Sequence, residues 1–447
     1  MPAPLTAARR AAALTAVLVV VAGGATTAPS VSLAAPAAAS IPSDGLYAEQ
    51  SALQPGAFIG APEAWKVASG AGVVVAVLDT GVDAGHPDLR GALWTNDGEV
   101  AGNGRDDDGN GYVDDIRGVD LVNGDGDPAD DEGHGTHVAG IIAARADGEG
   151  VVGLAPQALL MPVKVLDNRR GGNTDLLAEG IRYALANGAQ VINVSVNGAV
   201  TSSGLLAAVR QAVSAGVSIV ASAGNAGIDL GLTPSYPASY REASVLAVGA
   251  SDGDQAFAPF SNFGRDVALT APGVGILSTS NLGGHELRSG TSMAAPEVAG
   301  ALALLHSARP DLPDSALREA LLAGARRPRF LAGLTAGGAL DVAAALHHVV
   351  PDDRWPAAAP ASPGLIVKVK HRSGTAAARA RSLIVWKLSG DTSQIAGYQI
   401  TRGGKVLARR SSGRARGAWV AARRGLVTVS ALATDGSVVM RGRVRLR

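Results

Sequence analysis

The chain has 447 residues, of which 47% are hydrophobic and 17% charged, and it contains no cysteine. This length predicts two domains, and the composition is typical of a globular protein rather than a disordered one. The lack of cysteine excludes disulfides, thiolate zinc sites and a cysteine nucleophile.

Charge is balanced over the whole chain but not along it. Residues from Pro351 onward carry 19 Lys or Arg and 4 Asp or Glu. Of the 39 basic and 39 acidic residues in the chain, this leaves 20 and 35 for the part before Pro351. We therefore expect an acidic body followed by a basic tail.

The N-terminus has the features of an export signal. Arg9 and Arg10 precede an apolar run over 11–22, and small residues follow as far as Ser40. The run is short for a bilayer span and fits the core of a signal peptide, with a membrane anchor as the alternative. We predict a signal peptide over 1–39 and a secreted, extracellular protein. No later segment is apolar for long enough to predict stable membrane insertion.

Residues 40–350 are predicted to form an α/β domain. Five short runs are rich in β-branched and apolar residues, at 73–79, 158–166, 189–196, 217–224 and 244–251. Segments 174–188 and 203–216 have apolar residues at helical spacing and end in Gly. This alternation predicts a parallel sheet with helices on both faces, in which active sites lie at the carboxyl ends of strands.

The chain changes character after residue 350. A Pro- and Ala-rich segment over 351–364 is predicted to be a linker. Over 365–447, runs such as LIVKVK, SLIVWKL and LVTVSAL alternate apolar and polar residues between Gly-containing turns. They predict a small antiparallel β-sandwich. Trp386 and the Gly397-Tyr398 pair loosely resemble fibronectin type III or immunoglobulin-like modules.

Three segments place reactive residue types at the ends of predicted elements. Asp79 ends the strand in VAVLDTG, where an acidic side chain is costly unless another group pairs with it. His134 precedes an apolar helix in GHGTHVAG, and His137 makes a metal-binding pair the alternative. Ser292 starts a long apolar helix in SGTSMAAP, where the helix dipole favours developing negative charge. Taken alone, Asp79 and Ser292 are better explained as a turn residue and a helix N-cap.

Together these motifs closely resemble the subtilisin-like serine proteases. V-x-D-T-G, G-H-G-T-H-V-A-G and G-T-S-M-A-A-P occur in this order, and the resemblance covers residues 45–349. It implies that Ser292 is the nucleophile, His134 the general base and then acid, and Asp79 the residue that orients the imidazole. The segment ASAGNAG (221–227) matches the family's oxyanion segment, which implies that Asn225 is a donor beside the Ser292 N–H.

The same resemblance implies where an extended substrate binds. VINVSVNG (191–198) is similar to the strand that pairs with substrate main chain. Asn197 stands where the family usually has glycine, and Ser222 where a small apolar residue is common, so the cleavage preference stays open. Glu297 replaces a frequent His after G-T-S-M-A-A-P. The predicted substrate-binding residues are Ser195, Val196, Asn197, Gly198, Ser222, Ala223 and Gly224.

Two acidic loops predict structural Ca²⁺, which would also clamp an exported protein that lacks disulfides. The first, NGRDDDGNGYVDD, has oxygen-bearing residues at alternate positions and a Gly at the bend, although Arg117 stands in place of a closing Glu. The second, DLVNGDGDPADDEGHGTH, resembles a calcium loop of thermostable subtilisin-like enzymes. Solvated acidic turns are the alternative. The predicted ligands are Asp106, Asp108, Asn110, Asp114 and Asp115 in the first loop and Asp120, Asp125, Asp127 and Asp130 in the second.

The sequence thus predicts a secreted serine endopeptidase that cleaves proteins or peptides and acts as a monomer. The alternatives are a non-catalytic binding protein on a degenerate protease fold and an esterase or amidase that uses the same triad. The arginine-rich tail is expected to bind an anionic cell-wall polymer or another polyanion, or to dock on the acidic catalytic domain. A solvated basic surface is the alternative for the tail.

Overall fold

The computed structural model describes residues 42–240, 245–252 and 256–356, followed by strands between 364 and 446. The predicted signal peptide over 1–39 lies outside the described residues, as do residues 357–363 of the predicted linker. No helix of the described part is long and apolar enough to cross a membrane.

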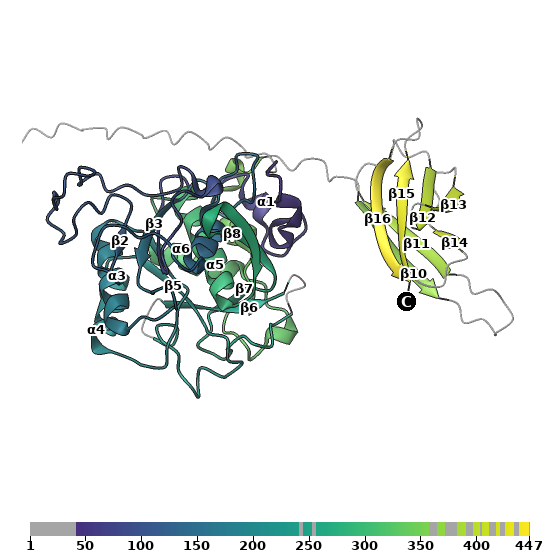
Figure 1. The fold of residues 1–447 in the computed structure, drawn as a ribbon. Helices are drawn as coiled ribbons and strands as arrows, with labels where there is room; N and C mark the ends of the chain where they lie inside the picture. Colours follow the sequence, from purple (N-terminus) through teal and green to yellow (C-terminus); the bar gives the residue numbers. More distant parts are fainter. Residues whose placement is uncertain are drawn as a thin grey trace, which may run out of the picture. The chain divides into compact units, whose positions relative to one another are not determined.

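A seven-stranded sheet forms the centre of the first part (Figure 1). Its order is β2-β3-β1-β4-β5-β6-β7, and all neighbouring strands are parallel, as the sequence predicts. The strands are β1 (Val74–Asp79), β2 (Val119–Asp120), β3 (Leu159–Lys164), β4 (Val191–Val194), β5 (Ser218–Ser222), β6 (Val245–Ser251) and β7 (Leu269–Pro272). The central position of β1 explains its apolar run, because a strand in a covered parallel sheet is buried on both faces.

Helices cover both faces of this sheet, and each layer has its own hydrophobic core (Figure 1). On one face lie α3 (Thr174–Ala186) and α4 (Ser203–Ser214). On the other face lie α1 (Ala61–Ala64), α2 (His134–Ala143), α5 (Thr291–Ala308), α6 (Asp314–Gly324) and α7 (Val342–His347). A hairpin of β8 (Ile276–Ser280) and β9 (Gly284–Arg288) contacts α2. Short 3₁₀ turns lie at Tyr47–Glu49, Ser51–Leu53, Pro87–Leu89, Asn281–Gly283, Arg329–Leu331 and Asp352–Arg354.

Local chemistry sets the ends of α3 and α4. Asn173 and Ser202 cap their N-termini: the Asn173 side chain accepts two backbone N–H groups of the first turn, and the Ser202 side chain accepts one. Gly188 and Gly216 follow their C-termini, each at φ +76°, a region that glycine enters without strain. Ala189 N–H then bonds back to Ala184 O. The glycines that end both sequence patterns therefore stop the helices and return the chain to β4 and β5.

The part after residue 363 forms two antiparallel sheets, as a small sandwich requires. One has the order β10-β11-β14 and the other β13-β12-β15-β16. Tyr398, Ile400 and Val429 are buried in it, and Tyr398 and Ile400 show the expected period of two. The strands are β10 (Gly364–His371), β11 (Ser382–Ser389), β12 (Gly397–Arg402), β13 (Lys405–Arg410), β14 (Gly417–Val420), β15 (Gly425–Leu432) and β16 (Val438–Leu446). The likeness to fibronectin type III or immunoglobulin-like modules stays a prediction.

The start of the predicted linker is packed against the α/β domain. Trp355 stacks on His347 with ring centroids 3.7 Å apart, and Arg354 Nη1 donates to Ala308 O at 3.1 Å. Trp355 also packs against the hydrophobic core on the α5 face. The structured α/β domain therefore continues to Trp355, five residues beyond the predicted boundary at residue 350.

Candidate active site

The sheet and α2 bring Asp79 and His134 together. Asp79 is the last residue of β1 and is fully buried, and His134 is the first residue of α2 rather than the residue before it. His134 Nδ1 lies 2.7 Å from Asp79 Oδ1, which also accepts the Thr80 N–H at 2.8 Å. A carboxylate can only accept hydrogen bonds, so the proton sits on Nδ1 and leaves Nε2 as a base.

Gly135 allows α2 to approach the end of β1 closely. A Cβ at this position would lie 2.0 Å from Gly81 O and 3.1 Å from Asp79 Cβ. The Gly135 N–H instead donates to Thr80 Oγ1 at 2.9 Å. Any side chain at residue 135 would push His134 away from Asp79.

Asp130 lies in the loop before α2 and contacts both the residue after β1 and the first turn of α2. Its carboxylate accepts bonds from Thr80 Oγ1 at 2.9 Å, Gly133 N at 2.8 Å, and Thr136 N and Oγ1 at 2.9 and 2.6 Å. Burial alone would raise the pKa of Asp130, but these hydrogen bonds hold the pKa below its ordinary value. These contacts hold the loop before His134 in place. They do not support the prediction that Asp130 is a metal ligand.

Glu132 is a neighbour of His134 that sequence reasoning missed. Its Oε2 accepts the His134 backbone N–H at 2.7 Å, and its Oε1 bonds to Arg170 Nε at 2.9 Å. Arg288 Nη1 lies 3.6 Å from Oε2. Burial opposes ionisation, but the two guanidinium groups lower the pKa of Glu132. A carboxylate at the start of α2 complements the helix dipole, which is the signal that marks it in the sequence.

Ser292 lies in the first turn of α5 and is tied to the chain after β4. Pro296 has no N–H, so the Ser292 carbonyl loses its partner inside the helix. Ser195 Oγ donates to this carbonyl at 3.0 Å, and Ser292 Oγ donates to Ser195 O at 3.0 Å. The Ser292 N–H is one of those that a helix start leaves without an internal acceptor.

Asn225 has one end of its amide fixed. Its Oδ1 accepts Thr291 N at 2.8 Å and Thr291 Oγ1 at 3.0 Å. Asn225 is exposed, and no described residue is bonded to Nδ2, so this end can bind a ligand. The start of α5 therefore sets the direction of this donor, next to Ser292.

One cleft, of about 530 Å³, is lined by His134, Asn225 and Ser292 together. The chain after β4, residues 195–198, lines it as well. Ser222, Ala223 and Gly224 do not line it and are buried behind it. The cleft lies where β1, β4 and β5 end, which is the expected place in a parallel sheet.

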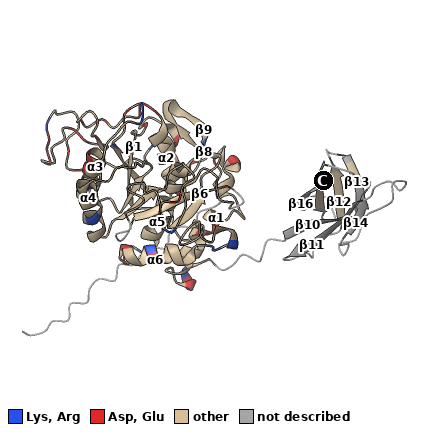
Figure 2. Ribbon diagram, turned by 90° about the horizontal axis from the view of Figure 1, so that it is seen from below, with Lys and Arg blue, Asp and Glu red and all other residues tan. Residues whose placement is uncertain are grey.

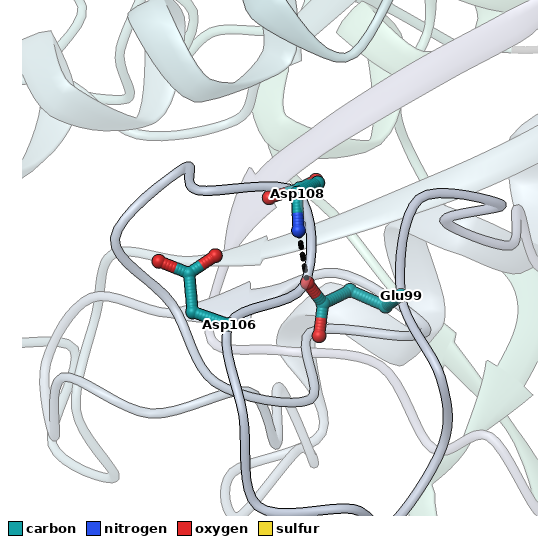
Figure 3. Close-up of side chains that lie close together, drawn as sticks. All are labelled: Glu99, Asp106 and Asp108. Carbon is teal, nitrogen blue, oxygen red and sulfur yellow. Dashed lines mark hydrogen bonds between the residues drawn. The ribbon is translucent and has the colours of Figure 1, made fainter.

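The first acidic loop gathers carboxylates, but not the set that the sequence suggests. Oxygens of Glu99, Asp106 and Asp108 lie within 4.8 Å of one another, and no other such group of His, Asp and Glu occurs in the described part of the chain (Figure 3). Glu99 was not predicted, because it lies outside the alternating pattern. The Asp108 N–H donates to Glu99 Oε1 at 3.1 Å. All-oxygen ligands suit a hard cation such as Ca²⁺.

The other predicted metal ligands make different contacts. Asp115 is buried among Asn96, Asn110 and Tyr183, whose Oη donates to it at 2.6 Å. Burial raises the pKa of Asp115, and these hydrogen bonds oppose the rise. Asp114 accepts backbone N–H groups of residues 103 and 104, and Asp120 and Asp125 accept those of the residues that follow them. Acidic residues recur along these loops, where the ribbon is coloured red in Figure 2.

The fold and the cleft place the chain among α/β proteins that carry the side chains of a serine hydrolase at the carboxyl edge of a parallel sheet. A sequence model of the Subtilase family matches residues 70–348. The chain belongs to the subtilase family.

Named relatives agree with this assignment. Thermitase from Thermoactinomyces vulgaris is 41% identical over 250 residues, covering 56% of this chain and 80% of that protein. Subtilisin DY from Bacillus licheniformis is 39% identical over 253 residues, covering 56% and 83%. An intracellular serine protease from Paenibacillus polymyxa is 42% identical over 253 residues, covering 55% and 70%. The chain is therefore a subtilisin-like serine protease by family.

A solved structure shows the same fold. A protease from Pseudoalteromonas arctica matches with a TM-score of 0.59 and 30% identity. The match covers 69% of this chain and 99% of that one.

Proposed function

We propose that the chain hydrolyses peptide bonds through Asp79, His134 and Ser292 by way of an acyl-enzyme. The observation that carries this proposal is the 2.7 Å contact between His134 Nδ1 and buried Asp79 Oδ1, in a cleft that Ser292 also lines. This contact leaves His134 Nε2 as the proton acceptor.

The reaction has two halves. Ser292 Oγ attacks the scissile carbonyl carbon and passes its proton to His134 Nε2, while Asn225 Nδ2 and the Ser292 N–H hold the oxyanion. The imidazolium then gives this proton to the leaving amine, and the C–N bond breaks to leave an ester on Ser292. Water repeats the sequence on the ester, releasing the acid and restoring the hydroxyl. The Asp79 carboxylate stabilises the imidazolium.

Extended peptide is the substrate that the cleft suits. Residues 195–198 line the cleft, and main-chain groups of such a segment can pair with any extended sequence. Protein or peptide substrates are therefore proposed for this chain.

Casein and a matched peptide ester test the proposal. Full-length enzyme should cleave casein, a serine-directed inhibitor should block cleavage with one covalent adduct, and Ser292→Ala should abolish cleavage while leaving the chain folded. Cleavage of the ester alone would favour an esterase. Casein binding without cleavage would favour a non-catalytic binding protein. Substantial casein cleavage by Ser292→Ala would overturn the triad.

We also propose that Glu99, Asp106 and Asp108 hold a structural Ca²⁺. Their carboxylates lie within 4.8 Å of one another, and each also accepts backbone N–H groups that fix the loop. A cation would offset the repulsion among three negative charges. Its chemistry would be structural, because the cluster lies outside the lining of the cleft.

We also propose that the protein is secreted and that its basic tail binds polyanions. The signal-like N-terminus supports export, and the excess of 19 basic over 4 acidic residues after 350 supports binding to anionic polymer or to the acidic domain.

A further inference from the structure

The ends of β4 and β5 form the two sides of a gap beside Ser292. The strands pair in parallel as far as Val194 and Ala221, and the chain continues past them on each side of the gap. Ser292 Oγ contacts Ser195 O on one side. Asn225 follows the other side directly. The scissile carbonyl must lie between Ser292 Oγ and the Asn225 amide, so the substrate residue that carries this carbonyl has its side chain nearest the gap.

The side chain of Asn197 crosses this gap. Its Nδ2 lies 3.5 Å from Ser222 Oγ, on the opposite strand. A Cβ at Gly224 would lie 3.2 Å from the same Nδ2, so the carboxamide packs against the glycine backbone. Asn197 is exposed and lines the cleft, while Ser222, Ala223 and Gly224 are buried and do not line it. The carboxamide therefore separates these three residues from the cleft.

The surface that the gap presents to a substrate side chain is therefore polar. A carboxamide offers two donors and an acceptor. A large apolar side chain entering the gap would bury the polar atoms of this carboxamide without partners, which is costly. A small side chain leaves Asn197 in place, and an amide or hydroxyl side chain can bond to it. The 3.5 Å contact with Ser222 Oγ is at the long limit of a hydrogen bond and is easily exchanged for a substrate group.

We propose that Asn197 makes this protease select substrates whose residue on the acyl side of the scissile bond is small or carries an uncharged hydrogen-bonding group. The proposal rests on the proposed proteolytic function and names the substrate class of that cleft.

The test uses peptides that are identical except for Ala, Asn, Leu or Phe on the acyl side. Wild-type enzyme should give higher kcat/KM for the Ala and Asn peptides than for the Phe peptide. Asn197→Gly should open the gap and raise the Phe-to-Ala ratio of kcat/KM by roughly 10- to 100-fold, the range that pocket size alone supplies. Asn197→Ser should give an intermediate shift if the glycine variant does not fold. The matched control is Asn187→Gly, at the end of α3 and outside the cleft lining.

An unchanged ratio in both Asn197 variants, or a wild-type preference for Phe, would overturn the proposal. A measurement of peptide binding distinguishes failure of this selectivity proposal from failure of the proposed proteolytic function. The same peptides are titrated into Ser292→Ala, which needs no turnover. Tighter binding of the Asn peptide than of the Phe peptide, reversed in Ser292→Ala with Asn197→Gly, supports the selection even if wild type cleaves none of them. Equal binding of all four peptides would overturn it.

Discussion

Ser195 and Ser292 are joined by two reciprocal hydrogen bonds. Ser195 Oγ donates to Ser292 O, and Ser292 Oγ donates to Ser195 O, each at 3.0 Å. The first bond is available because Pro296 cannot engage the Ser292 carbonyl inside α5. The pair fixes the first turn of α5 against the chain that follows β4, and so places the proposed nucleophile at the edge of the sheet.

This pairing predicts a coupling between Ser195 and Pro296. Ser195→Ala leaves the Ser292 carbonyl without its donor, and we expect the free energy of unfolding to fall by about 1 kcal/mol. Adding Pro296→Ala supplies an N–H inside the helix and should recover part of that loss. Urea denaturation of both single variants and the double variant measures the coupling. Strictly additive effects would contradict the role given to Pro296.

Asn225 predicts a separation of activity from stability. Asn225→Asp keeps the acceptor for Thr291 but loses the Nδ2 donor and adds negative charge near the oxyanion. We expect kcat to fall at least as far as the roughly 100- to 1,000-fold known for loss of one such donor, with little change in melting temperature. Asn225→Ala should lose activity and also stability, because Thr291 loses its acceptor. Equal stability losses in the two variants would count against this division of roles.

Glu297 predicts a stability change with pH. It lies on α5, is 2% exposed, and its Oε2 has no hydrogen-bond partner among the described residues, so burial raises its pKa from 4.5 to about 8. The folded state therefore keeps a proton that the unfolded state releases between these values, and stability falls as pH rises through this window. The slope for one group is at most about 1.4 kcal/mol per pH unit.

Substitution of Glu297 isolates this contribution. Glu297→Met should stabilise the chain relative to wild type at pH 8, and the gain should shrink as pH falls toward 4.5. Glu297→Gln, which is neutral at every pH, should show the same dependence on pH with a smaller gain. Chemical denaturation at several pH values measures it. A gain that is constant across this range would mean that the carboxyl does not titrate as described.

The acidic loop predicts that chelation destabilises the α/β domain. A ligand present at 100 times its Kd stabilises the folded state by about 2.7 kcal/mol, so removing Ca²⁺ should lower the melting temperature. Glu99→Gln should reduce the effect of chelator, although sequence patterning does not mark Glu99 as a ligand. Asp353→Asn, an exposed change in a distant 3₁₀ turn, is the control. An unchanged melt of wild type in excess chelator would leave the loop as a set of solvated turns.

The charge of the tail predicts retention on anionic polymer that weakens with salt. Truncation after Pro356 keeps the contacts of Arg354 and Trp355 with the α/β domain. The truncated chain should lose retention on an anionic polysaccharide column and keep its turnover of small peptides. Retention of the full chain should fall as the Debye length shortens from about 10 Å at 0.1 M salt.

A different result would place the tail on the acidic domain. In that case truncation raises activity on large substrates at low salt, and the difference fades at high salt. No effect of truncation at any salt concentration would show that the tail is only a solvated basic surface.

The sequence by itself determined the parallel α/β architecture and the positions of Asp79 and Ser292 at the ends of elements. These features follow from local signals: runs buried on both faces, helical spacing and glycines after helices. The family motifs added the roles, because residues of the three types stand in a fixed order. Most of the strands after residue 363 also follow from a period of two, although β13 and β14 were not predicted.

Only the tertiary structure decided which side chains meet across the chain. Glu99 lies beside Asp106 and Asp108, Asp130 accepts hydrogen bonds from Thr80 and Thr136, and the Asn197 carboxamide contacts the last residue of β5. The geometry of these contacts depends on how loops close over a packed sheet. Periodicity reports which face of an element is buried, but it carries no information on which loop atoms lie within hydrogen-bond distance.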